Sequence, residues 1–161
     1  MSINTQTPLF QIARITLSTD DIKSSECQCA LRDLASVSYF KPLNDNNGPY
    51  EVILAVEDHR LVIRTRNALE QDLMTHVLAL RPWHNLIQDY FLMIESYEKA
   101  RAHATREKLE AIDMGRRGLH NEGAELLMSR LKDKIEMDLD TARKFFTLIC
   151  ALHRTSARMT G

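Results

Sequence analysis

Residues 50–67 read YEVILAVEDHRLVIRTRN, and this stretch decides the fold class. The apolar residues of its first half recur at every second position, as they do on one face of a β-strand. Residues 57–59 have the polar composition of a tight turn, and residues 60–67 then alternate between arginines and aliphatic side chains. Because a further β-prone run follows at residues 73–80, the sequence predicts an antiparallel meander with one face in solvent.

Helical patterns flank the predicted meander. A β-prone segment at residues 10–17 precedes a helix that ends near Ser38, and its start is open between Ser18, Asp21, Ser24 and Ser25. After the meander, Pro82 opens a helix with a wide apolar stripe, since the first helical turn tolerates the missing N–H of proline. Three shorter helices are then expected, with caps at the residues Thr105, Asn121 and Asp140.

These elements predict one α+β domain over residues 1–161. A short antiparallel meander should pack against about five helices, and the C-terminal half should be all helical. Residues 1–8 and 155–161 are expected to be flexible tails. The length of 161 residues is sufficient for one domain with a hydrophobic core.

The composition excludes several classes of protein. The formal net charge is −1, which argues against nucleic acid as a partner. The chain has three cysteines, an odd number that is typical of a reducing compartment. Because the N-terminus lacks the features of a signal peptide and no run is apolar enough to span a membrane, we expect a cytoplasmic protein without membrane contact.

The residues from Gly115 to Gly123 read GRRGLHNEG and are the strongest candidate for a functional site. We expect the preceding helix to end near Met114, with Gly115 as its C-terminal cap, and the next helix to begin near Asn121. Free N–H groups at a helix N-terminus attract anions, and arginines bind phosphate or carboxylate with two parallel hydrogen bonds. The sequence therefore predicts a pocket for an anionic small molecule, built by the residues Arg116, Arg117, His120 and Asn121.

Two other interpretations of this segment remain open. An enzyme acting on a phosphorylated or carboxylated metabolite would use His120 as its acid–base group, because histidine exchanges protons near neutral pH. Alternatively, the segment is a plain connection between helices in a protein-interaction module. In that case the glycines supply backbone freedom, and the arginines pair with Asp113 or Glu122.

The same segment belongs to a longer block that resembles a known family. Ala111 to Gly123 (AIDMGRRGLHNEG) is similar to a signature block of a bacterial family catalogued as uncharacterised protein family 0262. The resemblance implies a small soluble bacterial protein and no particular activity. Supporting stretches are GPY at 48–50, RLV at 60–62, DYF at 89–91, ESY at 95–97, and DTAR followed by FTLICALH within 140–153.

Neither a metal nor a cofactor is expected. Cys27 and Cys29 diverge by about 200° on a helix, so they do not bind one ion together. Cys150 lies in an apolar run, and His76 shares a strand face with apolar residues, so both are interpreted as packing residues.

Two surfaces remain to be interpreted. The arginine-bearing face of the second strand is interpreted as a solvated sheet face and not as an RNA contact. The aromatic stripe of the helix that begins at Pro82 is interpreted as core. Its breadth is also compatible with a homodimer interface.

Overall fold

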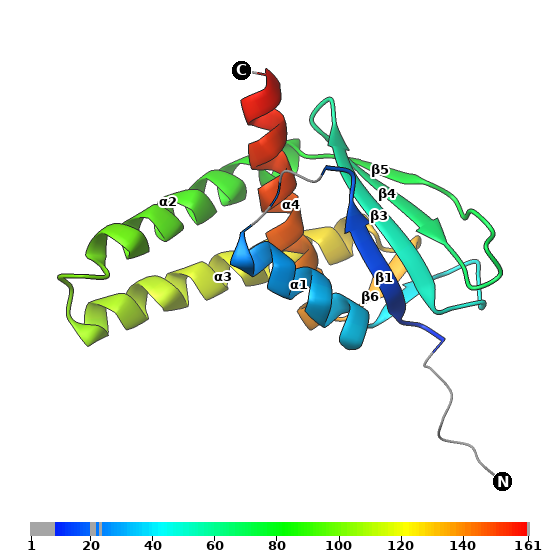
Figure 1. Cartoon of the computed structure of the whole chain (residues 1–161), viewed down its shortest axis with the longest axis horizontal. Coiled ribbons are helices and arrows are strands. Elements are labelled where there is room, and N and C mark those ends of the chain that lie inside the picture. Colours follow the sequence, from blue (N-terminus) through cyan, green and yellow to red (C-terminus); the bar gives the residue numbers. More distant parts are fainter. Residues whose placement is uncertain (1–8, 20–21, 23, 161) are drawn as a thin grey trace, which may run out of the picture.

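The computed structural model describes residues 9–19, 22 and 24–160, with side chains as far as Thr155. It has the predicted α+β architecture, and the described residues form four α-helices where about five were expected (Figure 1). The elements in chain order are β1 (Ile12–Leu17), α1 (Ser25–Ser36), β2 (Phe40–Pro42), β3 (Tyr50–Glu57), β4 (Arg60–Arg66), β5 (His76–Ala79), the 3-10 helix η1 (Arg81–Trp83), α2 (His84–Ala100), α3 (Arg106–Arg130), β6 (Ile135–Met137) and α4 (Leu139–Thr160).

The predicted meander is confirmed as part of a mixed sheet. Strands β3, β4 and β5 pair antiparallel in sequence order, and β1 adds to the edge of β3 in parallel. In the β3–β4 register Leu54 lies opposite Ile63, and both side chains are buried. The alternation of β3 and β4 therefore places their aliphatic face on the core, as the sequence indicates.

Helix α4 forms the centre of the core. It packs against α1, α3 and β3, and its residues Phe145, Phe146 and Ile149 are fully buried. Trp83, at the start of the α2 region, is also fully buried and donates its indole N–H to the carbonyl of Gly123 at 3.2 Å. This hydrogen bond connects the beginning of α2 with the second half of α3.

The sheet, α1 and α4 make a body from which α2 and α3 project as a helical hairpin (Figure 1). Thr105 begins α3 as predicted, because its hydroxyl accepts a hydrogen bond from the backbone N–H of Lys108. Ser24 caps α1 in the same way, through the N–H of Cys27.

Three predicted boundaries in the C-terminal half are wrong. Residues expected to continue a helix form β6, which pairs with β2 in a second, two-stranded sheet. Helix α4 is capped by Asp138, which accepts from the N–H of Thr141, whereas Asp140 pairs with Lys144. The helix also extends to Thr160, so residues 155–160 are no tail, while residues 1–8 lie outside the described residues.

Candidate functional site

The hairpin formed by α2 and α3 contains all four residues predicted to bind an anion. We define residues 91–122 as the arm. All of these residues are described, and none of them is buried, although Tyr90 and Gly123 at its two ends are. The apolar stripe of α2 is therefore core only in its first half. Beyond Tyr90 the stripe is only partly covered: Phe91 and Ile94 still pack against the core, whereas Leu92 is exposed.

The predicted turn within GRRGLHNEG does not exist, because α3 continues through it without a break. None of the described glycines has a positive φ, so Gly115 does not end a helix in the left-handed conformation. A side chain at Gly123 would collide with the ring of Phe146 on α4, and a Cβ at Gly115 would lie 2.6 Å from the terminal methyl of Met93 on α2. These two glycines allow close approach between helices and do not mark a turn. Since no helix begins near Asn121, the expected free N–H donors are absent at this described segment.

The two arginines of the segment are paired with carboxylates. Arg116 contacts Glu26 of α1 at 2.6 Å and Asp113 at 2.9 Å through its two terminal nitrogens. Arg117 contacts the second oxygen of Asp113 at 3.1 Å and is more exposed than Arg116. The two side chains diverge, because adjacent residues on a helix point about 100° apart, and Arg116 is the one that faces another element.

Glu26 extends this contact to α2. Its second carboxylate oxygen accepts a hydrogen bond of 2.7 Å from the hydroxyl of Tyr90. Burial, followed by the interaction with this carboxylate, raises the pKa of Tyr90 well above its usual value, so the hydroxyl stays a donor. Asp113, Arg116, Glu26 and Tyr90 thus form one network that joins α1, α2 and α3.

His120 is placed behind this network and not in a cavity. Its Nδ1 lies 3.1 Å from the carbonyl oxygen of Arg116, and its Nε2 lies 3.1 Å from the hydroxyl of Thr147. The carbonyl accepts, so Nδ1 carries the proton and the Thr147 hydroxyl donates to Nε2. The ring packs edge-on against Tyr90 and Phe146. Burial lowers the pKa of His120, which favours a neutral ring whose two nitrogens are both occupied.

A cavity of about 330 Å³ opens beside the network, on the side of the arm that faces α1. Of the four predicted residues only Arg116 lines it, and the side chain of Asn121 has no hydrogen-bond partner among the described residues. Sequence reasoning missed Glu26, which is distant in the chain, and assigned Tyr97 to the core. The described lining consists of Glu26, Ile94, Tyr97, Glu98, Ile112, Asp113 and Arg116.

The opposite side of the arm is uncovered. Met93 and Gly115 meet where the two antiparallel helices touch, so the residues preceding them, Leu92 and Met114, point to the same side. Leu92 is 60% exposed and Met114 is 71% exposed. Helical periodicity places three small residues next to them, and no atom lies within 4 Å of a Cβ built at Gly118. We call this surface the bare face and define it by Leu92, Ser96, Ala111, Met114 and Gly118.

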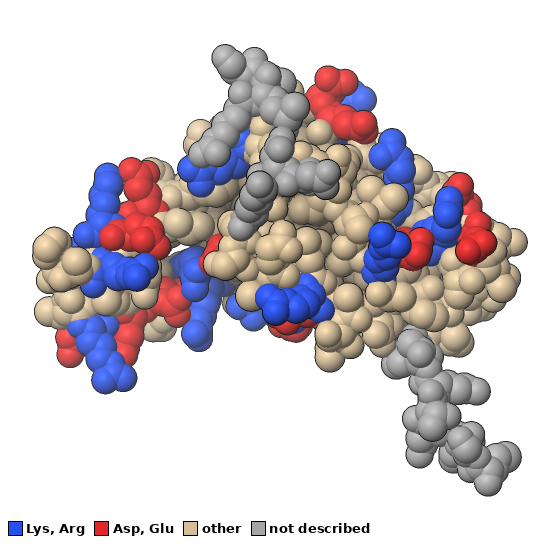
Figure 2. All heavy atoms as spheres, viewed as in Figure 1, with Lys and Arg blue, Asp and Glu red and all other residues tan. Residues whose placement is uncertain are grey.

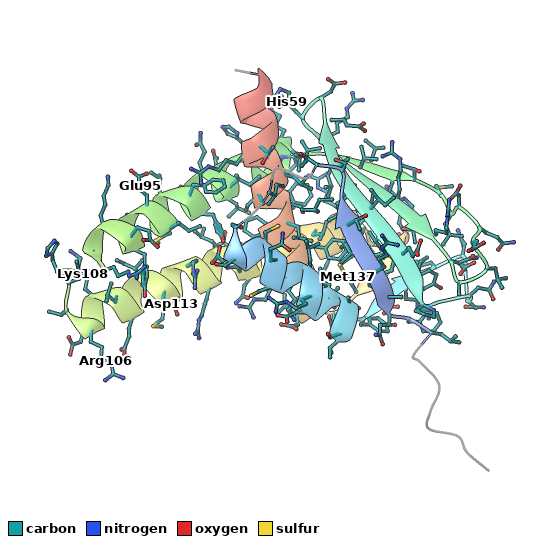
Figure 3. All side chains as sticks on the ribbon, viewed as in Figure 1. His59, Glu95, Arg106, Lys108, Asp113 and Met137 are labelled. Carbon is teal, nitrogen blue, oxygen red and sulfur yellow. The ribbon has the colours of Figure 1, made fainter. Side chains whose placement is uncertain are left out.

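Charged side chains of both signs cover the arm. Its 32 residues contain six Lys or Arg and six Asp or Glu, so its formal charge is zero. Figure 2 shows these two kinds of side chain interspersed over α2 and α3 at the left of the view. The labelled Lys108, Arg106 and Asp113 lie along the outer part of the arm in Figure 3. No charge of one sign dominates the surface of the arm.

Comparison with known proteins identifies relatives along nearly the whole chain. A family model described as Uncharacterised protein family (UPF0262) matches residues 10–155. A UPF0262 protein of Phenylobacterium zucineum is 49% identical over 131 residues, which cover 81% of each chain. A UPF0262 protein of Rhizobium etli is 44% identical over 136 residues, covering 84% of this chain and 86% of the relative. One of Brucella anthropi is 45% identical over 137 residues, covering 84% and 85%.

No solved structure matches the chain. Among the described residues, no helix combines the length and apolar character needed to cross a membrane.

Proposed function

The chain belongs to the Uncharacterised protein family (UPF0262), and we propose that it is a non-catalytic interaction module whose arm binds a second copy of the chain. One observation carries this proposal: no residue of the arm is buried, although two large apolar side chains lie together on its bare face. Two helices alone have no third element on which to bury such a surface, and exposed apolar patches of this kind are typical of interaction sites.

The two alternatives have less support. An anion at Arg116, Arg117, His120 and Asn121 stays a prediction, but it would have to displace Glu26 and Asp113 from the guanidinium groups. An enzyme using His120 stays a prediction as well. The ring packs edge-on against Tyr90 and Phe146 and contacts Arg116 and Thr147 through its nitrogens, so a substrate would have to displace one of these partners to reach it.

A second copy suits the bare face for a reason of charge. Asp89 lies one turn before Leu92 on the same side of α2, near the body. Lys99 lies two turns after Leu92, near the tip, where it also pairs with Glu95 of its own helix at 3.0 Å. If two arms pack in opposite directions about a two-fold axis, Lys99 of each copy meets Asp89 of the other. The small residues Ser96, Ala111 and Gly118 would let the four helices approach closely, as in an antiparallel bundle.

Sedimentation equilibrium of the full chain tests the proposal. The wild-type protein should be a dimer that dissociates on dilution, and Leu92→Asp or Met114→Asp should be monomeric at the same concentrations. Leu69→Asp is the matched control, because Leu69 is 62% exposed but lies on a loop far from the arm, and it should leave the dimer intact. Gly118→Arg should also prevent association, since a long side chain there would hold the helices apart.

Circular dichroism of each variant distinguishes loss of association from loss of folding. A wild-type chain that stays monomeric at every concentration would overturn the proposal. So would a dimer that is weakened as much by Leu69→Asp as by Leu92→Asp.

A further inference from the structure

A second hollow lies at the start of α2, away from the tip of the arm. It has a volume of about 390 Å³ and lies where the turn between β3 and β4 meets η1, the start of α2 and the last described turns of α4. Figure 3 labels His59, which belongs to that turn and lies on its side toward α4. The charged and titratable residues that line it are Asp58, His59, Arg60, Arg81, His84 and His153.

These residues make the hollow basic. Arg60 and Arg81 have no ion-pair partner among the residues that the structure describes, in contrast to Arg116 and Arg117. Asp58 is the single acid in the described lining. Three histidines from three different elements add nitrogens that can donate, and no described side chain forms a hydrogen bond with them.

The backbone holds this cluster in place. Asp58 and His59 both have positive φ values, 52° and 59°, as in the tight two-residue turns that connect hairpin strands. The N–H of Leu80 donates to the carbonyl of His59 at 3.0 Å, which fixes the turn beside Arg81. The buried Trp83 anchors the following segment, so His84 begins α2 from a rigid position. The hollow is therefore formed by packed elements and not by a long loop.

We infer that this hollow is a binding site for a doubly charged oxyanion of the phosphate or sulfate type, held by Arg60 and Arg81 and assisted by His59, His84 and His153. Guanidinium groups suit such anions because they offer paired N–H donors. A metal ion is the other ligand that histidines suggest. However, the described residues contain no group of three His, Cys, Asp or Glu side chains that is placed to hold one. This site is separate from the bare face of the arm, and the two proposals can fail independently.

His153 also makes the site sensitive to pH. Burial lowers the pKa of His153, because it removes water from the charged ring, and the neighbouring His84 and His59 lower this pKa further. A bound dianion would favour the protonated ring of His153. The charged groups facing His153 are Asp58, His59 and Arg60 from the turn, Arg81 from η1, and His84 from α2. Binding should therefore strengthen as the pH falls from about 8 to about 6.

Titration of the full chain with sodium sulfate, followed by NMR of the histidine rings, tests the inference. Sulfate keeps its double charge throughout this pH range, so a pH effect reports on the protein and not on the ligand. We expect saturable shifts of the His84 and His153 signals, and Arg60→Gln or Arg81→Gln should weaken the affinity by about ten-fold or more, as for a lost hydrogen bond to a charged group. His153→Gln should reduce the change of affinity with pH. Titration with inorganic phosphate at constant pH should rank the affinities of the variants in the same order.

Arg64→Gln is the matched control, because Arg64 lies on the same strand face as Arg60 but outside the hollow and pairs with Glu57. It should leave sulfate affinity unchanged. Equal weakening by Arg64→Gln and Arg60→Gln would show non-specific charge attraction and overturn the site. Shifts without saturation, or binding of zinc ions with no response to sulfate, would overturn it as well. Loss of the dimer in Leu92→Asp should leave sulfate binding intact.

Discussion

At the scale of single residues, the three glycines of α3 have three different environments. Gly123 lies against the ring of Phe146, where an added methyl group has no room, and the ring is fully buried and held on all sides. Gly115 lies against the flexible end of Met93, which is able to move away. Gly118 faces open space in the single chain. The same residue type is therefore required by packing at one position and not at another.

Alanine substitutions at two of these glycines should have opposite effects on stability. Gly118→Ala should raise the free energy of unfolding by roughly 0.5–1 kcal/mol, because alanine is the better helix former. Gly123→Ala should lower it, since overpacking costs about 1–3 kcal/mol and exceeds the gain in helix propensity. Urea unfolding at low protein concentration measures both. A Gly123→Ala variant as stable as Gly118→Ala would contradict the close packing of α3 on α4.

At the scale of elements, α3 is one helix of 25 residues where the sequence pattern predicts two helices and a turn. Glycine inside a helix is unfavourable by about 1 kcal/mol relative to alanine, so three glycines in nine residues favour a break. Packing against α2 and α4 opposes that preference, because the close contacts exist only if α3 stays straight. The hydrogen bond from the indole N–H of Trp83 to the carbonyl of Gly123 also stabilises the continuous helix.

Proline at position 118 distinguishes a continuous helix from a turn. Gly118→Pro should lower the free energy of unfolding by about 3 kcal/mol or more, because it removes a helical hydrogen bond and collides with the preceding turn. Circular dichroism and urea unfolding measure the loss, with Gly118→Ala as the control for removing the glycine. A Gly118→Pro variant close to wild-type stability would instead support the predicted break.

At the scale of the whole molecule, several histidines are held in surroundings that favour their neutral form. Burial is the largest cause of the lowered pKa at His76, His120 and His153. The unfolded chain therefore binds more protons than the folded one once the pH falls below about 6.5, the usual pKa of histidine. Stability is fully present above that pH and is lost as the pH falls through the lowered values.

The free energy of unfolding should therefore decrease between about pH 7 and about pH 5, a range in which histidine is the main titrating residue. Urea unfolding in buffer without phosphate or sulfate measures it, so that no anion fills the basic hollow. His120→Gln should make the decrease less steep. A stability that stays constant or rises as the pH falls would contradict the burial of these rings.

Several features of this protein are determined by the sequence alone because their causes are local. The alternation in residues 50–66 is enough to predict β3, β4 and the face that each buries. Thr105 is recognisable as a cap from its own position, because the bond it makes spans three residues. The block around GRRGLHNEG is long enough to indicate the family. Of the residues that the sequence proposed for a site, Arg116 is the one that lines the cavity beside the network.

Only the tertiary structure decided the rest, because it depends on which distant surfaces meet. Glu26 precedes Arg116 by 90 residues, and no pattern in either segment predicts that the two side chains meet. The strand β6 forms because it pairs with β2. A segment of three residues is too short to show the alternation that predicts a strand. Whether a glycine ends a helix or lets a neighbouring helix approach closely depends on Met93 and Phe146, which lie in other helices. The basic hollow likewise brings together His59, Arg81 and His153, whose charges are adjacent only after the chain has folded.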